Sequence, residues 1–196
     1  MFRQGDRFQS LYALRSGCVK TYTLSDSGEE QITGFYMPGE LIGLSGIDSQ
    51  AYPVSAIAIE TTSICEIPYS HFDKLMDEIP GLKRQLIHSL SKEIREDLHM
   101  KLLLSQKNAD ERVANFLLDL STRIKRRGYA ADFIYLAMSR NEIANYLGLA
   151  VETVSRVFTR LQKNGLLTVN GRSVEIHSPE ELTRVSGQCI FSDIKQ

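Results

Sequence analysis

A long stretch without proline, from about Gly81 to Gln106, most constrains how this chain can fold. Within it, a set of positions steps alternately by four and three residues, which is the spacing of a coiled-coil seam. The seam is apolar in its middle, and its members are Lys83, Ile87, Leu90, Ile94, Asp97, Lys101 and Leu104. The pattern predicts one long helix. Such a helix is either a spine packed on its own domain or half of a homodimer interface, and the pattern leaves both open.

The region before this helix is strand-like. Short β-rich runs such as "CVKTYTL" and "SICEIP" alternate with turn signals, and Asp26, Ser27 and Gly28 are typical of a hairpin tip. A short helical segment, "SHFDKLMDEIP", follows the last run. This spacing predicts a compact β-barrel or β-roll rather than alternating β and α units, and therefore an α+β protein.

Charge is distributed unevenly, although the formal net charge of the 196 residues is only -1. Residues 1 to 107 hold 11 Lys and Arg against 14 Asp and Glu, whereas residues 121 to 172 hold 9 against 3. A locally basic segment in a neutral chain is typical of a nucleic-acid-binding part joined to a part with another task. An ordinary solvated face has the same composition, so the motifs must decide.

The segment "MSRNEIANYLGLAVETVSRVFTRLQKNGLL" has the pattern of a helix-turn-helix. Ser139 and Glu142 form a capping box that starts the first helix. Gly148 supplies the turn between two short helices. The second helix is predicted from about Val151 to Asn164, because Gly165 is the residue type expected just past a helix end.

The second helix has two different faces. Its apolar face, predicted to pack on the first helix, consists of Val154, Val157, Phe158 and Leu161. The opposite face carries Glu152, Ser155, Arg156 and Thr159. Arginine can donate two parallel hydrogen bonds to guanine, serine reaches a base or a phosphate, and glutamate accepts from the amine of cytosine. We therefore predict a recognition helix in the major groove; the alternative is a plain exposed ion pair between Glu152 and Arg156, worth roughly a few tenths of a kcal/mol.

A hairpin is predicted directly after the recognition helix. Asn170 and Gly171 favour a two-residue turn between two strand-like segments. Arg172, beside the tip, is placed to meet a phosphate. The hairpin completes a winged helix-turn-helix, which predicts double-stranded DNA as a partner.

Together these motifs resemble the Crp/Fnr superfamily of bacterial transcription regulators, specifically its fumarate and nitrate reduction regulator (FNR) branch. The resemblance covers essentially the whole chain and is carried by "LYALRSG", "EEQITGF", "CEIP", "LLLSQKNADERVANFLLDLS" and "NYLGLAVETVSR". It implies a sensory β-roll of cyclic-nucleotide-binding type, N-terminally incomplete, over residues 1–80. It further implies a dimerisation helix over 81–107 and a winged helix-turn-helix domain over 108–196.

The resemblance also implies partners. Glu152, Ser155 and Arg156 would read half-sites of TTGAT type in a palindrome. The seam would be a parallel homodimer interface centred on Ile87, Leu90, Ile94 and Asp97. Contacts with RNA polymerase are expected near three surface positions whose simpler interpretation is a plain turn, namely Ser16, Gly28 and Thr61.

Asp97 is the unusual member of the predicted seam. In a parallel pair its two copies would approach each other, and like carboxylates close together cost free energy. Dimerisation would then be adjustable rather than permanent. The alternative is that Asp97 turns to solvent or pairs with Lys101.

Cysteine usage departs from the oxygen-sensing members of this family, which bind a [4Fe-4S] cluster through three closely spaced N-terminal cysteines and one in the β-roll. Cys65 matches the β-roll position, whereas Cys18 and Cys189 fit a buried or incidental thiol. One thiolate does not hold a four-iron cluster. We expect no cluster in the chain as given, and a cluster in a longer parent that supplies three cysteines.

Cyclic AMP is not expected as a ligand. The family's site combines a Gly-Glu pair with an arginine that meets the cyclic phosphate. Gly39 and Glu40 are present, but Val54 occupies the position of that arginine, which leaves the phosphate without a charge partner.

Other classes of protein fit the sequence poorly. The chain has no run of about 18 apolar residues and its start is too polar for a signal peptide, so we expect a cytoplasmic protein without a membrane partner. No enzyme is expected, because the four histidines, His71, His88, His99 and His177, stand apart from any nucleophile. The alternative function is that of a small-molecule-sensing β-roll whose winged helix mediates protein contact.

Overall fold

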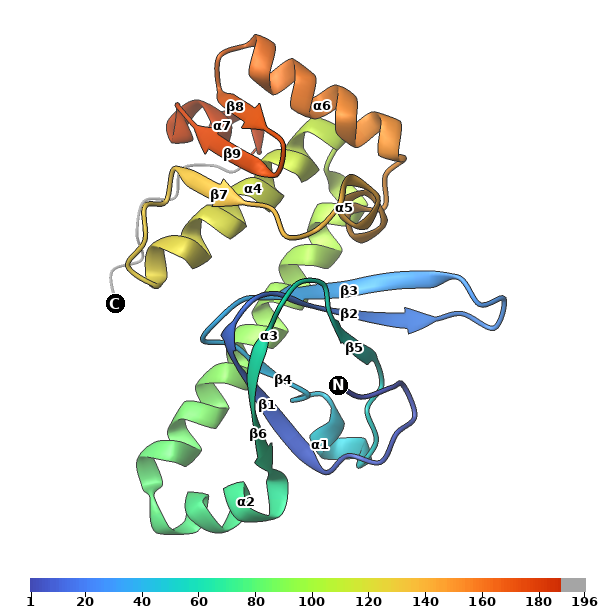
Figure 1. The fold of residues 1–196 in the computed structure, drawn as a ribbon, viewed down its shortest axis with the longest axis vertical. Coiled ribbons are helices and arrows are strands. Elements are labelled where there is room, and N and C mark those ends of the chain that lie inside the picture. The colour runs from blue at the N-terminus through green and yellow to red at the C-terminus, as the bar shows by residue number, and fades with distance from the viewer. Residues whose placement is uncertain (188–196) are drawn as a thin grey trace. The chain divides into compact units, whose positions relative to one another are not determined.

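A computed structural model describes residues 1–187 of the chain. These residues belong to two compact units, Met1–Met100 and Lys101–Gln196. The boundary lies inside the long helix α3 (Pro80–Gln106), so that residues 101–106 of this helix belong to the second unit. Figure 1 shows α3 as one continuous helix.

Two three-stranded antiparallel sheets form the first unit. One sheet has the order β4-β1-β6, with strands Leu41–Ile42, Ser10–Ser16 and Ser63–Pro68. The other has the order β3-β2-β5, with strands Glu30–Tyr36, Val19–Leu24 and Ser55–Ala58. Helices α1 (Gly46–Ser49) and α2 (Tyr69–Glu78) complete the roll. The predicted β-roll is thus confirmed. Strands β1 and β6 pair from Ser10↔Pro68 to Ser16↔Ser63, with a register shift between Leu14 and Ser16.

The core of the roll is filled by large apolar side chains from nearly every element. It consists of Phe2, Phe8, Leu11, Leu14, Val19, Ile42, Leu44, Tyr52, Ala56, Phe72, Met76 and Leu86. Tyr52 is polar at one end only, and its hydroxyl donates to the backbone carbonyl of Ser10 at 2.7 Å. The one polar group of these core side chains therefore has a hydrogen-bond partner, and the core contains no charged side chain.

The hairpin between β2 and β3 closes as the sequence predicts. The amide of Gly28 donates to the carbonyl of Ser25 at 2.9 Å, and the φ of Gly28 is +81°. That left-handed conformation favours glycine over any residue with a Cβ. The tip at Asp26, Ser27 and Gly28 is exposed.

Helix α3 has one side against the roll and one apolar side in solvent. Leu86 is buried in the core of the roll, and Leu82 and Leu90 pack partly against it. Five apolar residues of α3 are exposed: Leu104 (38%) and four that are more than half exposed, Ile87 (58%), Ile94 (61%), Leu98 (55%) and Leu102 (56%). We call the four residues that are more than half exposed the apolar stripe. Ile87 and Ile94 are also members of the predicted seam, whereas Leu90 is half-buried and packs partly against the core of the roll.

The second unit is a winged helix-turn-helix. Its elements in chain order are α4 (Ala109–Arg126), β7 (Phe133–Tyr135), α5 (Arg140–Leu147), α6 (Val151–Lys163), β8 (Leu167–Asn170), β9 (Ser173–Ile176) and α7 (Pro179–Val185). The three strands form one antiparallel sheet in the order β7-β9-β8. The predicted helix-turn-helix and hairpin are confirmed, whereas β7 and α7 were not predicted.

Candidate nucleic-acid interface

Helix α5 is held at both ends by the residues that the sequence singles out. The amide of Glu142 donates to Ser139 Oγ at 3.2 Å, and the amide of Ser139 donates to Glu142 Oε2 at 2.8 Å. This capping box satisfies amides that the first turn of a helix leaves unpaired. Gly148 ends the helix with a φ of +61°. The chain therefore turns sharply into α6, as predicted.

Helix α6 buries one face and exposes the other. Val154, Val157, Phe158 and Leu161 are at most 4% exposed. The four predicted base-reading residues, Glu152, Ser155, Arg156 and Thr159, are all exposed on the opposite side. Helix periodicity thus places these four polar side chains together on the surface, where a duplex can reach them.

No ion pair or hydrogen bond engages the side chains of Glu152 and Arg156 among residues 1–187. The simple alternative of a salt bridge between them is therefore not what the structure contains. Thr159 Oγ1 donates to the carbonyl of Ser155 at 3.0 Å, so its hydrogen is used within the helix and its oxygen can still accept. Donors and acceptors consequently face outward from the first two turns.

A shallow depression of about 530 Å³ lies along this side of α6. It is lined only by polar side chains, namely Ser155, Arg156, Thr159, Arg160, Lys163 and Asn164. Three of the six are cationic. Arg160 is held in place by an ion pair with Asp110 at the start of α4. A surface of this kind attracts a polyanion and provides hydrogen-bonding groups in fixed positions.

Two arginines that the sequence analysis missed shape this interface. The guanidinium of Arg140, at the start of α5, lies 3.5 Å from the ring centroid of Phe158 on α6. Stacking of a cation on an aromatic face stabilises the pairing of the two helices. Arg160 is anchored by Asp110, which is 50 residues away in the sequence. Neither contact has a local signature, because each joins separate elements.

The wing forms the predicted hairpin. Asn170 pairs with Ser173 at the tip, and Gly171 has a φ of +59°. Arg172 is exposed, but its Nη1 donates to the carbonyl of Ala137 at 3.3 Å. The side chain therefore lies back toward the loop that precedes α5.

The Gly39–Glu40 turn of the first unit has partners within the protein. Glu40 Oε2 accepts from the amide of Met37 at 2.9 Å, and Glu40 Oε1 lies 3.4 Å from Lys92 Nζ on α3. At the next residue of α3, Glu93 Oε1 accepts a hydrogen bond from the hydroxyl of Tyr36 at 3.3 Å. Burial raises the pKa of Glu93, and this hydrogen bond partly offsets the rise. These contacts explain the Gly39–Glu40 turn as a docking point for α3.

The three positions expected to meet RNA polymerase are all exposed. The structure brings two of them together: the backbone of Gly17, next to Ser16, packs so closely on Thr61 and Thr62 that a Cβ there would lie 2.6 Å from the carbonyl oxygen of Thr61. Gly28 is at the tip of the β2–β3 hairpin instead (Figure 1).

Two of the three cysteines lie in the described part of the chain. Cys18 is buried, whereas Cys65 is exposed on β6, and Cys189 lies outside the described residues. Within residues 1–187, no three or more His, Cys, Asp or Glu side chains are grouped so that they could hold a metal ion. In the same range, no helix has the length and apolar character that crossing a membrane requires.

Comparisons with known proteins agree with this architecture. Residues 1–79 match the family model described as a cyclic nucleotide-binding domain, and residues 111–185 match that of a Crp-like helix-turn-helix domain. The transcriptional activator protein anr of Pseudomonas aeruginosa is 58% identical over 187 residues, which cover 95% of this chain and 77% of that protein. The fumarate and nitrate reduction regulatory protein of Escherichia coli is 45% identical, with 95% and 75% covered. Among solved structures, FixK2 from Bradyrhizobium japonicum has a TM-score of 0.87 at 30% sequence identity. The match covers 96% of this chain and 93% of the FixK2 chain.

Proposed function

The chain belongs to the Crp/Fnr family of transcription regulators, and from this premise we propose that it binds palindromic DNA with TTGAT-type half-sites as a homodimer. The observation that carries the proposal is the exposed, uncommitted pair Glu152 and Arg156 at the leading end of α6. Arg156 would donate to guanine O6 and N7, and Glu152 would accept from a cytosine amine. Ser155, Thr159 and Arg172 would add contacts to bases or phosphates.

Glu152 also explains why the interface is not simply basic. A carboxylate close to phosphates lowers the affinity for DNA of any sequence. The carboxylate is favourable only where a base edge offers a hydrogen-bond donor. It therefore increases the difference in affinity between the correct DNA site and a wrong one. Its place in the first turn of α6 suits the helix dipole as well.

The experiment that tests this function compares two duplexes of equal length at several salt concentrations. One carries the TTGAT palindrome and the other the same bases in scrambled order. Affinity for the palindrome should be higher by about 10³-fold or more, and both affinities should fall as salt rises. Equal binding of the two duplexes would contradict sequence-specific recognition. An absence of salt-dependent binding would favour a winged helix that contacts protein.

The apolar stripe on α3 is the surface we propose for dimerisation. Ile87 and Ile94 belong to the predicted seam, and Leu98 and Leu102 lie farther along the same helix. Four large apolar side chains, each more than half exposed, are a costly feature for a helix without a partner. A second copy of the same helix would cover them and would place two recognition helices on successive major grooves.

Asp97 flanks the stripe, is exposed, and forms no ion pair with Lys101 within the described part of the chain. We therefore expect Asp97→Ala to raise the dimer association constant by about two- to five-fold, because exposed charge pairs contribute roughly 0.2–1 kcal/mol. Sedimentation velocity over a concentration series measures this constant. Glu96→Ala is the matched control, since it removes a carboxylate from the same helix away from the stripe. An unchanged constant for Asp97→Ala would remove this residue from the interface.

As an activator of transcription, the protein would also have to contact RNA polymerase. Both DNA and polymerase would be met in the cytoplasm. We propose the paired surface at Ser16 and Thr61 for this contact, together with the hairpin tip at Gly28. The close packing of Gly17 on Thr61 makes Ser16 and Thr61 parts of one surface, which supports a shared role.

A further inference from the structure

The side chain of Arg112, on the first turns of α4, joins two helix ends that are far apart in the sequence. Its Nε donates to the carbonyl of Lys107 at 2.9 Å, and its Nη2 donates to the carbonyl of Leu104 at 2.8 Å. Its Nη1 donates to the carbonyl of Leu147 at 2.9 Å and lies 3.4 Å from that of Gly148. One guanidinium thus bonds the end of α3 and the end of α5 at the same time.

Physical chemistry favours an arginine at this point. The last carbonyls of a helix have no partner within the helix, and the dipole places partial negative charge there. Two such ends converge on Arg112, and a planar guanidinium presents donors in a rigid fork that can serve both. Lysine has the charge but not the fork.

The turn of the helix-turn-helix is packed tightly against the same helix end. A Cβ added to Gly148 would lie 3.5 Å from Arg112 Nη1 and 3.8 Å from Leu104 Cδ2. The turn that orients α6 therefore touches both the end of α3 and the side chain that bonds it.

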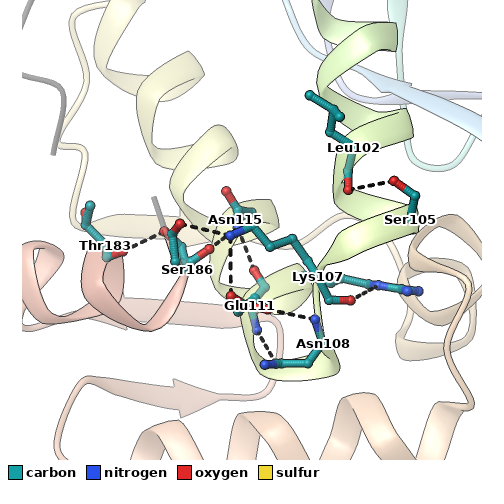
Figure 2. A network of polar contacts seen from close by, with 10 residues as sticks. Leu102, Ser105, Lys107, Asn108, Glu111, Asn115, Thr183 and Ser186 are labelled. Atoms are coloured by element: carbon teal, nitrogen blue, oxygen red, sulfur yellow. Dashed lines mark hydrogen bonds and ion pairs between the residues drawn. The ribbon is translucent and has the colours of Figure 1, made fainter. Parts of the chain in front are cut away.

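The opposite side of the α3–α4 junction is also held by polar contacts (Figure 2). Asn108 and Glu111 form a reciprocal capping box that starts α4. Lys107 Nζ donates to the carbonyl of Gly187 at 2.9 Å, and Asn115 Nδ2 donates to the carbonyl of Ser186 at 2.8 Å. The junction is thus bonded to the two residues that follow α7 as well as to the end of α5. The division of the chain at Met100 agrees with an end of α3 that belongs to the second unit.

We propose that Arg112 is a positioning residue for DNA recognition: it fixes the angle between the end of the dimerisation helix and the helix-turn-helix. In a dimer that angle sets the separation of the two copies of α6, and thereby the half-site spacing that is bound best. Arg112 contacts no base in this arrangement. The inference rests on the proposed function, since it concerns how two recognition helices are held for one palindrome.

The test uses the full chain with Arg112→Gln, Arg112→Lys and, as a charge-matched control, Arg184→Gln on α7. Each protein is titrated with the palindrome, with the palindrome lengthened by one base pair between its half-sites, and with a duplex that has one half-site. For Arg112→Gln we expect affinity for the palindrome to fall about ten-fold, and the preference over the lengthened site to shrink, because preorganisation is lost. Affinity for the single half-site should change by less than about two-fold. Arg112→Lys should behave like Arg112→Gln, and Arg184→Gln like the unaltered protein.

Three results would overturn the inference. An equal loss on the palindrome and on the half-site would mean that Arg112 acts on each α6 separately, through phosphate contact or stability. Full recovery by Arg112→Lys would mean that charge alone matters. Unchanged spacing preference in Arg112→Gln would mean that the angle is set elsewhere.

A measurement without DNA separates this inference from the proposed function. If the unaltered protein shows no preference for the palindrome, the TTGAT assignment fails, but hydrogen exchange still tests Arg112. In Arg112→Gln, exchange should rise in both segments that Arg112 joins, residues 101–107 and 147–150, while the middle of α6 stays protected. An unchanged exchange pattern would exclude the bracing role, whatever DNA the protein prefers.

Discussion

Replacing Arg156 by alanine is expected to lower the affinity for a TTGAT duplex by about 1 to 3 kcal/mol and to relax the preference at the guanine. The side chain is exposed on α6, lies in the polar depression, and has no partner within the described residues that would compete for it. In the variant, both hydrogen bonds that Arg156 would donate to the guanine are lost together. Fluorescence anisotropy with the TTGAT duplex, a duplex altered only at the guanine, and a scrambled duplex measures the effect.

Lys163→Ala is the control for the charge of Arg156. Lys163 lines the same depression at the other end of α6. A cation that meets only phosphate should weaken binding to all three duplexes alike and reduce the salt dependence. The assignment of Arg156 to a base is wrong if Arg156→Ala shows that same uniform loss.

Placing a carboxylate in the middle of the apolar stripe is expected to abolish the dimer. In Ile94→Glu the two copies would bring like charges into an apolar interface, and a buried, unpaired carboxylate costs several kcal/mol. We expect the dissociation constant of the dimer to rise by about 100-fold or more, since each 1.4 kcal/mol is a factor of ten. Sedimentation velocity gives the constant, and affinity for the palindrome should fall with it.

Gln85→Glu adds the same charge to α3 at an exposed position that faces away from the stripe. It should leave the dimer unchanged. Because Ile94 is itself 61% exposed, its replacement should not unfold the first unit, and circular dichroism verifies this. A dimer that survives Ile94→Glu would show that the two copies meet through a different surface.

Features made by neighbouring residues were predictable from the sequence. The capping box of Ser139 and Glu142, the left-handed turn at Gly148 and the hairpin at Asn170 and Gly171 each depend on a few adjacent residues. The two faces of α6 follow from helix periodicity alone, because Val154 and Phe158 recur at the spacing of one turn. Strand β7 was missed because it has only three residues, Phe133–Tyr135, and exists through pairing with β9.

The seam on α3 stays a prediction, but the structure shows which of its side chains are exposed. Alternating steps of four and three include Leu90 and Asp97, whereas the apolar side chains that are more than half exposed are Ile87, Ile94, Leu98 and Leu102. The two sets differ because the roll partly covers Leu90, and a pattern of apolar residues does not say which of two partners buries each one. An ideal helix also drifts from a strict 3.5-residue repeat, so the exposed stripe shifts toward Leu98.

The sequence by itself determined that this chain has a strand-rich first part, one long helix and a recognition helix with a mixed polar face, because local periodicity and capping specify such elements. Only the tertiary structure decided which groups remain available and which are engaged. Arg156 is open to a partner, Arg160 is held by Asp110, and Arg112 spans the ends of α3 and α5. The amino-acid sequence alone does not distinguish these three arginines. They differ because long-range packing places opposite charges and free carbonyls next to two of them and leaves solvent next to the third.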